Sequence, residues 1–180
     1  MECLDIDAPG VAPDAEAPTY ARVRAIGSVD WKREEEVTMN EYIPSPTGWV
    51  AEQVELYEAS GGTEGTTLRG LPVIIVTNRG RKTGAIRKTP VMRVADGTSY
   101  VLVASRGGAP THPVWYYNLK ADPNVEIRDR TEVYSMRVRE VEDPVERQRL
   151  WDLAVEAYPP YQDYQERTDR TIPVLVAEIT

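Results

Sequence analysis

A short basic turn is the first feature of the sequence that could bind a ligand. It reads GRKTG over residues 80–84, follows the apolar run GLPVIIVTN, and is itself followed by Arg87 and Lys88. No aspartate or glutamate occurs over residues 65–95. Arginine and lysine orient phosphate and carboxylate groups through strong charge-assisted hydrogen bonds, so the turn predicts a site for a polyanionic ligand. The P-loop spacing G-x-x-x-x-G-K-[ST] is absent, and a plain charged hairpin is the remaining alternative.

Two further stretches carry groups that suit a flat ligand. The segment SRGG, residues 105–108, places a serine and two glycines at the end of a predicted strand, where a planar molecule can approach the backbone. The segment HPVWYYNL then supplies Trp115, Tyr116 and Tyr117 on a short predicted helix. Core packing is the alternative for these aromatic side chains, and we expect it for at least one of them.

Three tyrosines lie close together in the segment YPPYQDYQERTDRTIP, which begins at Tyr158. Pro160 suits the first position of a helix, so Tyr161 and Tyr164 are predicted to share one helix face at i and i+3. Phenol rings provide apolar walls with polar tips, and a neutral phenol of pKa about 10 can donate a proton to a developing oxyanion. The segment therefore favours a wall that faces a substrate, and tyrosines that pack one end of a barrel are the alternative.

The elements that must position these motifs are mostly predicted strands. Runs rich in β-branched and aromatic residues occur at residues 72–78, 85–95, 99–105, 124–129, 132–142 and 172–179. Helices are predicted over residues 45–60, 111–123 and 143–157, the last with Asp143 as N-cap and Pro144 at its first position. Sequence-adjacent strands with short helices between them favour a mainly β (α+β) fold, a small antiparallel barrel or rolled sheet, over a parallel α/β sheet.

Composition limits the classes of function. The chain has 180 residues and a formal net charge of -8, which argues against a nucleic-acid partner. Its apolar runs are far shorter than the ~20 residues of a membrane helix, so no transmembrane segment is expected. Cys3 is the only cysteine and His112 the only histidine, so no metal site is expected.

The N-terminal region differs in texture from the rest. Residues 1–18 mix proline, acid and alanine without periodicity and are predicted to be a disordered tail. Residues 19–48 form an N-terminal extension, and residues 49–180 are predicted to be the folded domain. The acidic start lacks the basic and apolar regions of a secretory signal, so we expect a cytoplasmic protein. We also expect a monomer or a weak homodimer.

The motifs GRKTG, SRGG…HPVWYYNLKADPNV and YPPYQDYQERTDRTIPV, in this order and spacing, resemble the deazaflavin-dependent nitroreductase family. These are split-barrel reductases that use reduced coenzyme F420, and the resemblance covers the chain from Trp49 to the C-terminus. It implies a six-stranded antiparallel split β-barrel of the flavin-reductase and pyridoxamine-phosphate-oxidase type. It also implies hydride transfer from the reduced deazaflavin to a quinone, a nitroaromatic or an activated C=C bond. A non-catalytic barrel that carries a deazaflavin, a flavin or a similar anionic flat ligand is the alternative.

The resemblance implies a role for individual residues. The phosphate and glutamate tail of the cofactor would lie at Arg81, Lys82, Thr83 and Arg87. The deazaflavin ring would lie against Val103, Ala104, Ser105, Arg106, Val114, Trp115, Tyr116, Tyr117 and Asn118. The catalytic side would consist of Tyr158, Tyr161, Tyr164 and Ser105. Tyr161 is expected to bind and protonate the acceptor, with Ser105 near the reacting edge of the ring.

Overall fold

The structure is a computed structural model, and it describes residues 41–180. The predicted tail, residues 1–18, and residues 19–40 of the predicted extension lie outside the described residues.

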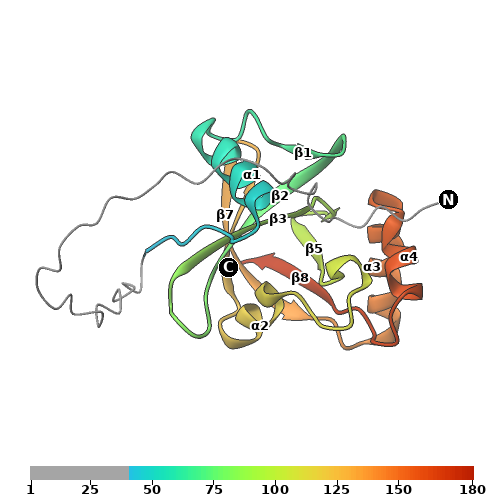
Figure 1. The fold of residues 1–180 in the computed structure, drawn as a ribbon. Coiled ribbons are helices and arrows are strands. Elements are labelled where there is room, and N and C mark those ends of the chain that lie inside the picture. The colour runs from blue at the N-terminus through green and yellow to red at the C-terminus, as the bar shows by residue number, and fades with distance from the viewer. Residues whose placement is uncertain (1–40) are drawn as a thin grey trace, which may run out of the picture. The chain divides into compact units, whose positions relative to one another are not determined.

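Strands joined in antiparallel pairs dominate the fold (Figure 1). They are β1 (Thr67–Leu68), β2 (Leu71–Arg79), β3 (Ile86–Met92), β4 (Ala95–Asp96), β5 (Ser99–Val103), β6 (Asn124–Asp129), β7 (Glu132–Glu140) and β8 (Val174–Ile179). Their order in the sheet is β1-β2-β6-β7-β8-β5-β4, and β3 pairs with β2. The mainly β, antiparallel architecture predicted from the sequence is confirmed.

The chain from β3 to β4 closes this sheet into a barrel. β3 pairs with β2 and β4 pairs with β5, yet only Arg93 and Val94 separate the two strands. The Arg93 amide donates to Pro72 O at 2.9 Å, and Val94 O accepts from the Val101 amide at 2.8 Å. The single strand predicted over residues 85–95 is therefore bent, because its halves pair with opposite ends of the sheet. When β3 and β4 are counted as one bent strand and the two-residue β1 is left out, the sheet has the six strands that were predicted.

Alternation along the strands builds two layers of core from one sheet. On β2, Ile74 and Val76 point into the barrel interior, whereas Val73 and Ile75 point outward beneath a helix. β5 repeats this pattern, with Leu102 inside the barrel and its neighbours outside. Successive side chains of a strand lie on opposite faces, so a run that is apolar at every position is buried on both faces.

Residues 41–180 contain four α-helices: α1 (Gly48–Ala59), α2 (Val114–Ala121), α3 (Pro144–Ala157) and α4 (Pro160–Glu166). α2 packs Leu119 against the barrel interior. α1 buries Val54 and Tyr57 against the outer side chains of β2. α3 lies beside β5, β8 and α4 (Figure 1). The predicted helices are present, and each begins or ends within a few residues of its predicted limits.

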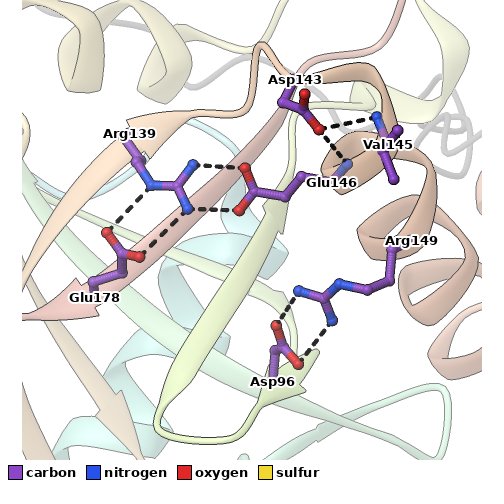
Figure 2. Close-up of polar contacts among 7 residues, drawn as sticks. All are labelled: Asp96, Arg139, Asp143, Val145, Glu146, Arg149 and Glu178. Atoms are coloured by element: carbon purple, nitrogen blue, oxygen red, sulfur yellow. Dashed lines mark hydrogen bonds and ion pairs between the residues drawn. The ribbon is translucent and has the colours of Figure 1, made fainter.

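Charged side chains fasten α3 to the sheet (Figure 2). Asp143 caps the helix as predicted, and its Oδ1 accepts from the amides of Val145 at 3.1 Å and Glu146 at 2.8 Å. Arg139 of β7 bridges Glu146 and Glu178 of β8, at 2.6 and 3.3 Å. Arg149 of α3 reaches Asp96 of β4 at 2.7 Å. These ion pairs attach α3 to β7 and β4.

Candidate functional site

The basic turn, residues 80–84, is a closed loop between β2 and β3. The amide of Gly80 donates to Ala85 O at 2.8 Å, and the amide of Gly84 donates to Gly80 O at 2.7 Å. Gly84 has a φ of 72°, in the left-handed region that favours glycine. The three residues between the glycines are exposed. The loop therefore presents a short, well-braced row of polar side chains to the surface.

Arg81 and Lys82 are the cations of the row that remain accessible. No ion pair engages either side chain within residues 41–180, and both are exposed. The Arg81 guanidinium carbon lies 5.2 Å from the centre of the Tyr117 ring, so a cation–π contact orients it. Thr83 completes the row, and its hydroxyl accepts from the Ala85 amide at 3.3 Å.

Two other cations of this stretch are already engaged. Arg87 donates from Nη1 to the carbonyls of Ile43 and Pro44 at 3.2 and 3.4 Å, which leaves its Nη2 group without a partner within residues 41–180. Lys88 forms an ion pair of 2.8 Å with Glu58 of α1. Lys88 is therefore less suited to bind an anionic ligand than the sequence suggests, because the Glu58 carboxylate already neutralises its charge.

A chain of amides ties the basic turn to α2. The Arg81 amide donates to Asn118 Oδ1 at 3.1 Å, and Asn118 Nδ2 donates to Asn78 Oδ1 at 3.2 Å. The first bond fixes the orientation of the Asn118 side chain, because a backbone N–H can only donate. Both asparagines are 3% exposed, and Asn78 Nδ2 is a buried donor without a partner within residues 41–180. A donor of this kind calls for an acceptor from a ligand or water.

The segment 104–109, here called the serine–glycine turn, follows β5. Residues 106–108 have φ values of 48°, 63° and 82°. A Cβ atom on Gly108 would lie 2.7 Å from Tyr164 O, so only glycine allows this close approach to α4. Ser105 is only 8% exposed, and its hydroxyl forms no hydrogen bond with residues 41–180. The hydroxyl oxygen itself is not fully buried, so it keeps some contact with solvent.

Other residues predicted to line the ring near this turn differ in what they expose. Val103 lies in the core beneath α3 and α4, and Ala104 lies in the barrel interior. Only their backbone can face a ligand. Arg106 is exposed, and its guanidinium donates to the Thr111 hydroxyl.

The aromatic residues of α2 divide between core and surface. Trp115 and Tyr116 are half-buried and pack against the barrel interior, so the expectation of core packing for at least one is confirmed. The Tyr116 hydroxyl donates to Glu140 Oε2 at 3.0 Å. Tyr117 lies beneath the guanidinium of the basic turn. Val114, at the start of the helix, is 71% exposed.

Arg170 is a residue of the site that the sequence did not reveal. Its Nε donates to Ala109 O at 2.8 Å, and its Nη2 donates to Ser105 O at 2.6 Å and Ala104 O at 3.2 Å. Its Nη1 lies 2.9 Å from His112 Nδ1. The segment RTDRTIP carries two arginines in a polar run, and nothing in that pattern distinguishes the second.

Tyr158, Tyr161 and Tyr164, here called the tyrosine cluster, pack edge-on against one another. The ring centres of Tyr158 and Tyr161 are 4.9 Å apart. The hydroxyls of Tyr158 and Tyr164 lie 3.1 Å apart, and one of them donates to the other. Tyr161 is 5% exposed, and its hydroxyl forms no hydrogen bond with residues 41–180. Tyr161 thus carries the hydroxyl of the cluster that has no internal partner.

Burial governs the protonation of these phenols. Desolvation raises the pKa of Tyr161 above its ordinary value, and the neighbouring tyrosines raise it further. Desolvation and the hydrogen bond to Tyr164 raise the pKa of Tyr158 to about 12. Both hydroxyls are therefore neutral donors near pH 7.

These contacts join motifs that are far apart in the sequence. The Arg81 amide connects the basic turn to α2, and Arg170 connects the start of α2 at His112 to the serine–glycine turn. Gly108 connects that turn to α4 and the tyrosine cluster. The structure thus links the basic turn, the aromatic helix, the serine–glycine turn and the tyrosine cluster through a series of direct contacts.

Two classes of feature are absent from the described part of the chain. Residues 41–180 contain no group of three or more histidine, cysteine, aspartate or glutamate side chains placed to hold a metal ion. No helix in the same range combines the length and the apolar character needed to cross a membrane.

Comparison with known proteins establishes the family. A family model described as F420H(2)-dependent quinone reductase matches residues 49–179. This chain belongs to the F420H(2)-dependent quinone reductase family. The resemblance to deazaflavin-dependent reductases inferred from the three motifs is confirmed, and the match begins at Trp49, where that resemblance began.

Individual relatives agree with the family. An F420H(2)-dependent quinone reductase of Mycobacterium tuberculosis is 38% identical over 125 residues, which cover 67% of this chain and 83% of the relative. The solved structure of an F420-H2 dependent reductase, FDR-A, is 48% identical, with a TM-score of 0.56 and coverage of 59% of this chain and 94% of that chain. A solved structure described as a domain-swapped dimer is 47% identical, with a TM-score of 0.59 and coverage of 74% and 100%.

Proposed function

We propose that this F420H(2)-dependent quinone reductase family member transfers a hydride from reduced coenzyme F420 to a quinone. The contacts that link the basic turn, α2, the serine–glycine turn and the tyrosine cluster carry the proposal. The basic turn offers cations to a polyanionic cofactor, and Ser105 and Tyr161 offer hydroxyl groups to a reducible acceptor. The name of the Mycobacterium tuberculosis relative supports a quinone as the acceptor.

The described residues suit the cofactor. Arg81 and Lys82 are exposed without an acidic partner within residues 41–180. Asn78, which Asn118 links to the turn, has a buried Nδ2 donor without a partner in the same range. We assign the phosphate and glutamate tail to Arg81, Lys82, Thr83 and the Nη2 group of Arg87. We assign the ring to the backbone of residues 103–105 and to Arg106 and the residues 114–118. When bound, the reduced deazaflavin supplies the hydride, and the protein supplies orientation and polarity.

The proton is assigned to Tyr161. The hydride brings two electrons to the quinone, and negative charge develops on a quinone oxygen. A neutral Tyr161 hydroxyl can donate to that oxygen and transfer its proton, which solvent then replaces. The hydroxyls of Tyr158 and Tyr164 are hydrogen-bonded to each other, and we assign their rings to the wall around Tyr161. Ser105 is the second available hydroxyl, and we place it near the reacting edge of the ring.

The proposal is tested with purified protein and reduced F420. Oxidation of the cofactor is followed with menadione, a nitroaromatic and an enone as acceptors, with FMN as the competing cofactor. We expect multiple turnovers with menadione and weaker binding of FMN. Tight binding of F420 without turnover on any acceptor would overturn the reductase proposal and support a carrier of deazaflavin. The nitroaromatic and the enone test the wider acceptor range that the motifs imply.

Assembly and location complete the proposal. We propose that the protein is a monomer or a weak homodimer and that it works in the cytoplasm. The relative described as a domain-swapped dimer makes exchange of an element between copies a specific form of that dimer to test. Light scattering of the purified full chain measures the assembly.

A further inference from the structure

The Arg170 guanidinium is unusual because it serves four acceptors around the serine–glycine turn. Three are backbone carbonyls of residues 104, 105 and 109, and the fourth is the imidazole of His112. This turn contains three consecutive residues of positive φ, and its only regular structure is the short 3₁₀ turn Arg106–Gly108. Arg170 thus adds side-chain donors to these carbonyls, of which Ser105 O also accepts from the Gly108 amide at 3.1 Å. The Nη1 group of the same guanidinium contacts the imidazole of His112.

The contact with Arg170 determines the protonation of His112. A guanidinium has no acceptor atom and remains charged, so Arg170 Nη1 must donate and His112 Nδ1 must accept at 2.9 Å. His112 is then neutral, with its proton on Nε2. Desolvation and the positive charge of Arg170 lower the pKa of His112 below its ordinary value, while Glu140 opposes them.

The opposite edge of the imidazole is available to a ligand. His112 Nε2 bonds to no residue of 41–180 and is not among the buried polar atoms without a partner. The ring packs 4.6 Å from Tyr116 and 5.9 Å from Tyr117, which restricts its rotation. Tyr117 in turn contacts Arg81 of the basic turn. His112 therefore presents a fixed N–H donor between the basic turn and the serine–glycine turn.

We propose that His112 is a ligand-binding residue that donates Nε2–H to an oxygen of the bound cofactor or acceptor, and that Arg170 is the positioning residue that holds it in that tautomer. The inference rests on the proposed function for the identity of the ligands. The tautomer and its dependence on Arg170 do not rest on it. Arg170 is not assigned a contact with a ligand; it acts by fixing the orientation of His112 and of the carbonyls of the serine–glycine turn.

The tautomer can be measured directly because His112 is the only histidine of the sequence. Protein without a histidine tag, labelled with ¹⁵N, gives a single imidazole in long-range ¹H–¹⁵N spectra. We expect the Nε2–H tautomer at neutral pH and a pKa below that of a free histidine. The charged and titratable groups facing the ring are Arg170, Tyr116, Tyr117 and Glu140. An Nδ1–H tautomer in the wild type would overturn the proposal.

Two variants of Arg170 test its role. Arg170→Met keeps the aliphatic length without a donor, and we expect a mixture of tautomers and a higher pKa for His112. Arg170→Lys keeps a charge but has a single donor group, so we expect an intermediate result. An unchanged tautomer and pKa in both variants would remove the positioning role. If neither variant folds, the tautomer of the wild type decides the matter.

Binding experiments then identify the ligand oxygen. We expect His112→Phe, which keeps a ring without the donor, to weaken one ligand by about two- to tenfold. His112→Gln returns an amide donor and should restore part of the loss. A higher Kd for oxidised F420 assigns the oxygen to the cofactor, and a higher KM for menadione alone assigns it to the acceptor. If neither constant changes, His112 is not a ligand-binding residue. Absence of turnover in the wild type contradicts the proposed function, and the spectra and the F420 titration remain readable.

Discussion

Removal of one oxygen atom from the tyrosine cluster tests the assigned chemistry. Tyr161→Phe keeps the ring, whose centre lies 4.9 Å from that of Tyr158 and 6.5 Å from that of Trp151. The hydroxyl forms no hydrogen bond with residues 41–180, so the folded protein loses no internal bond. We therefore expect the free energy of unfolding to change by less than about 1 kcal/mol.

The effect on turnover should be much larger than the effect on stability. A hydrogen bond to a charged group contributes about 1.5–3 kcal/mol, and here the charge develops on the acceptor only as the hydride arrives. Loss of this donor corresponds to a decrease in kcat/KM of about 10- to 150-fold. The Kd for F420 should stay within about threefold, because the hydroxyl is assigned to the acceptor and not to the cofactor.

Steady-state oxidation of reduced F420 by menadione measures kcat/KM, and fluorescence titration measures the Kd. Tyr134→Phe is the matched control, since Tyr134 lies on β7 against the barrel interior, in ring contact with Tyr100. Unchanged kcat/KM in Tyr161→Phe would refute the reasoning and move the proton to solvent or Ser105. A loss of F420 affinity as large as the loss of kcat/KM would also refute it, because the hydroxyl would then bind the cofactor.

Three further changes test the site and its support. Lys82→Ala should weaken F420 binding by about 1–2 kcal/mol, with a smaller effect at high salt, and titration at two ionic strengths measures this. Asp143→Ala should lower the free energy of unfolding by about 0.5–2 kcal/mol in urea without changing the Kd for F420. The hydrogen bond from Arg149 holds the pKa of Asp96 below its ordinary range, so below about pH 4 the unfolded chain binds more protons and stability falls. Asp96→Asn should flatten that dependence in acid titrations of unfolding.

The positions of helices and strands were largely predictable because their signals are local. Asp143 followed by Pro144 predicts a helix start, and the structure has α3 begin at Pro144 with the Asp143 side chain on two amides. The strand predicted over residues 85–95 shows the limit of local signals. Its composition favours strand throughout, but the bend at Arg93 and Val94 depends on two partners, β2 and β5, that lie on either side of it.

The candidate site was predictable as a set of motifs and not as a set of contacts. Arg81, Lys82, Arg87 and Lys88 look equivalent in the sequence, and the structure separates them by what each one meets. Arg170 carried no signal at all, since a donor that serves carbonyls of a distant turn has no required spacing from them. Its role is visible only in the folded structure, because the carbonyls that it binds, those of Ala104, Ser105 and Ala109, lie 61 to 66 positions earlier in the chain.

By itself the sequence determined the mainly β class, the Asp143 cap of α3, the concentration of positive charge in the basic turn and the family. Those features depend on propensity, charge and order along the chain, which need no knowledge of neighbours. Tertiary structure alone decided which cations remain accessible, which tyrosine hydroxyl is available, and which nitrogen of His112 carries its proton. Each of these depends on whether the folded chain brings a partner close, because a hydrogen bond or ion pair engages a group only when that partner comes within about 3 Å.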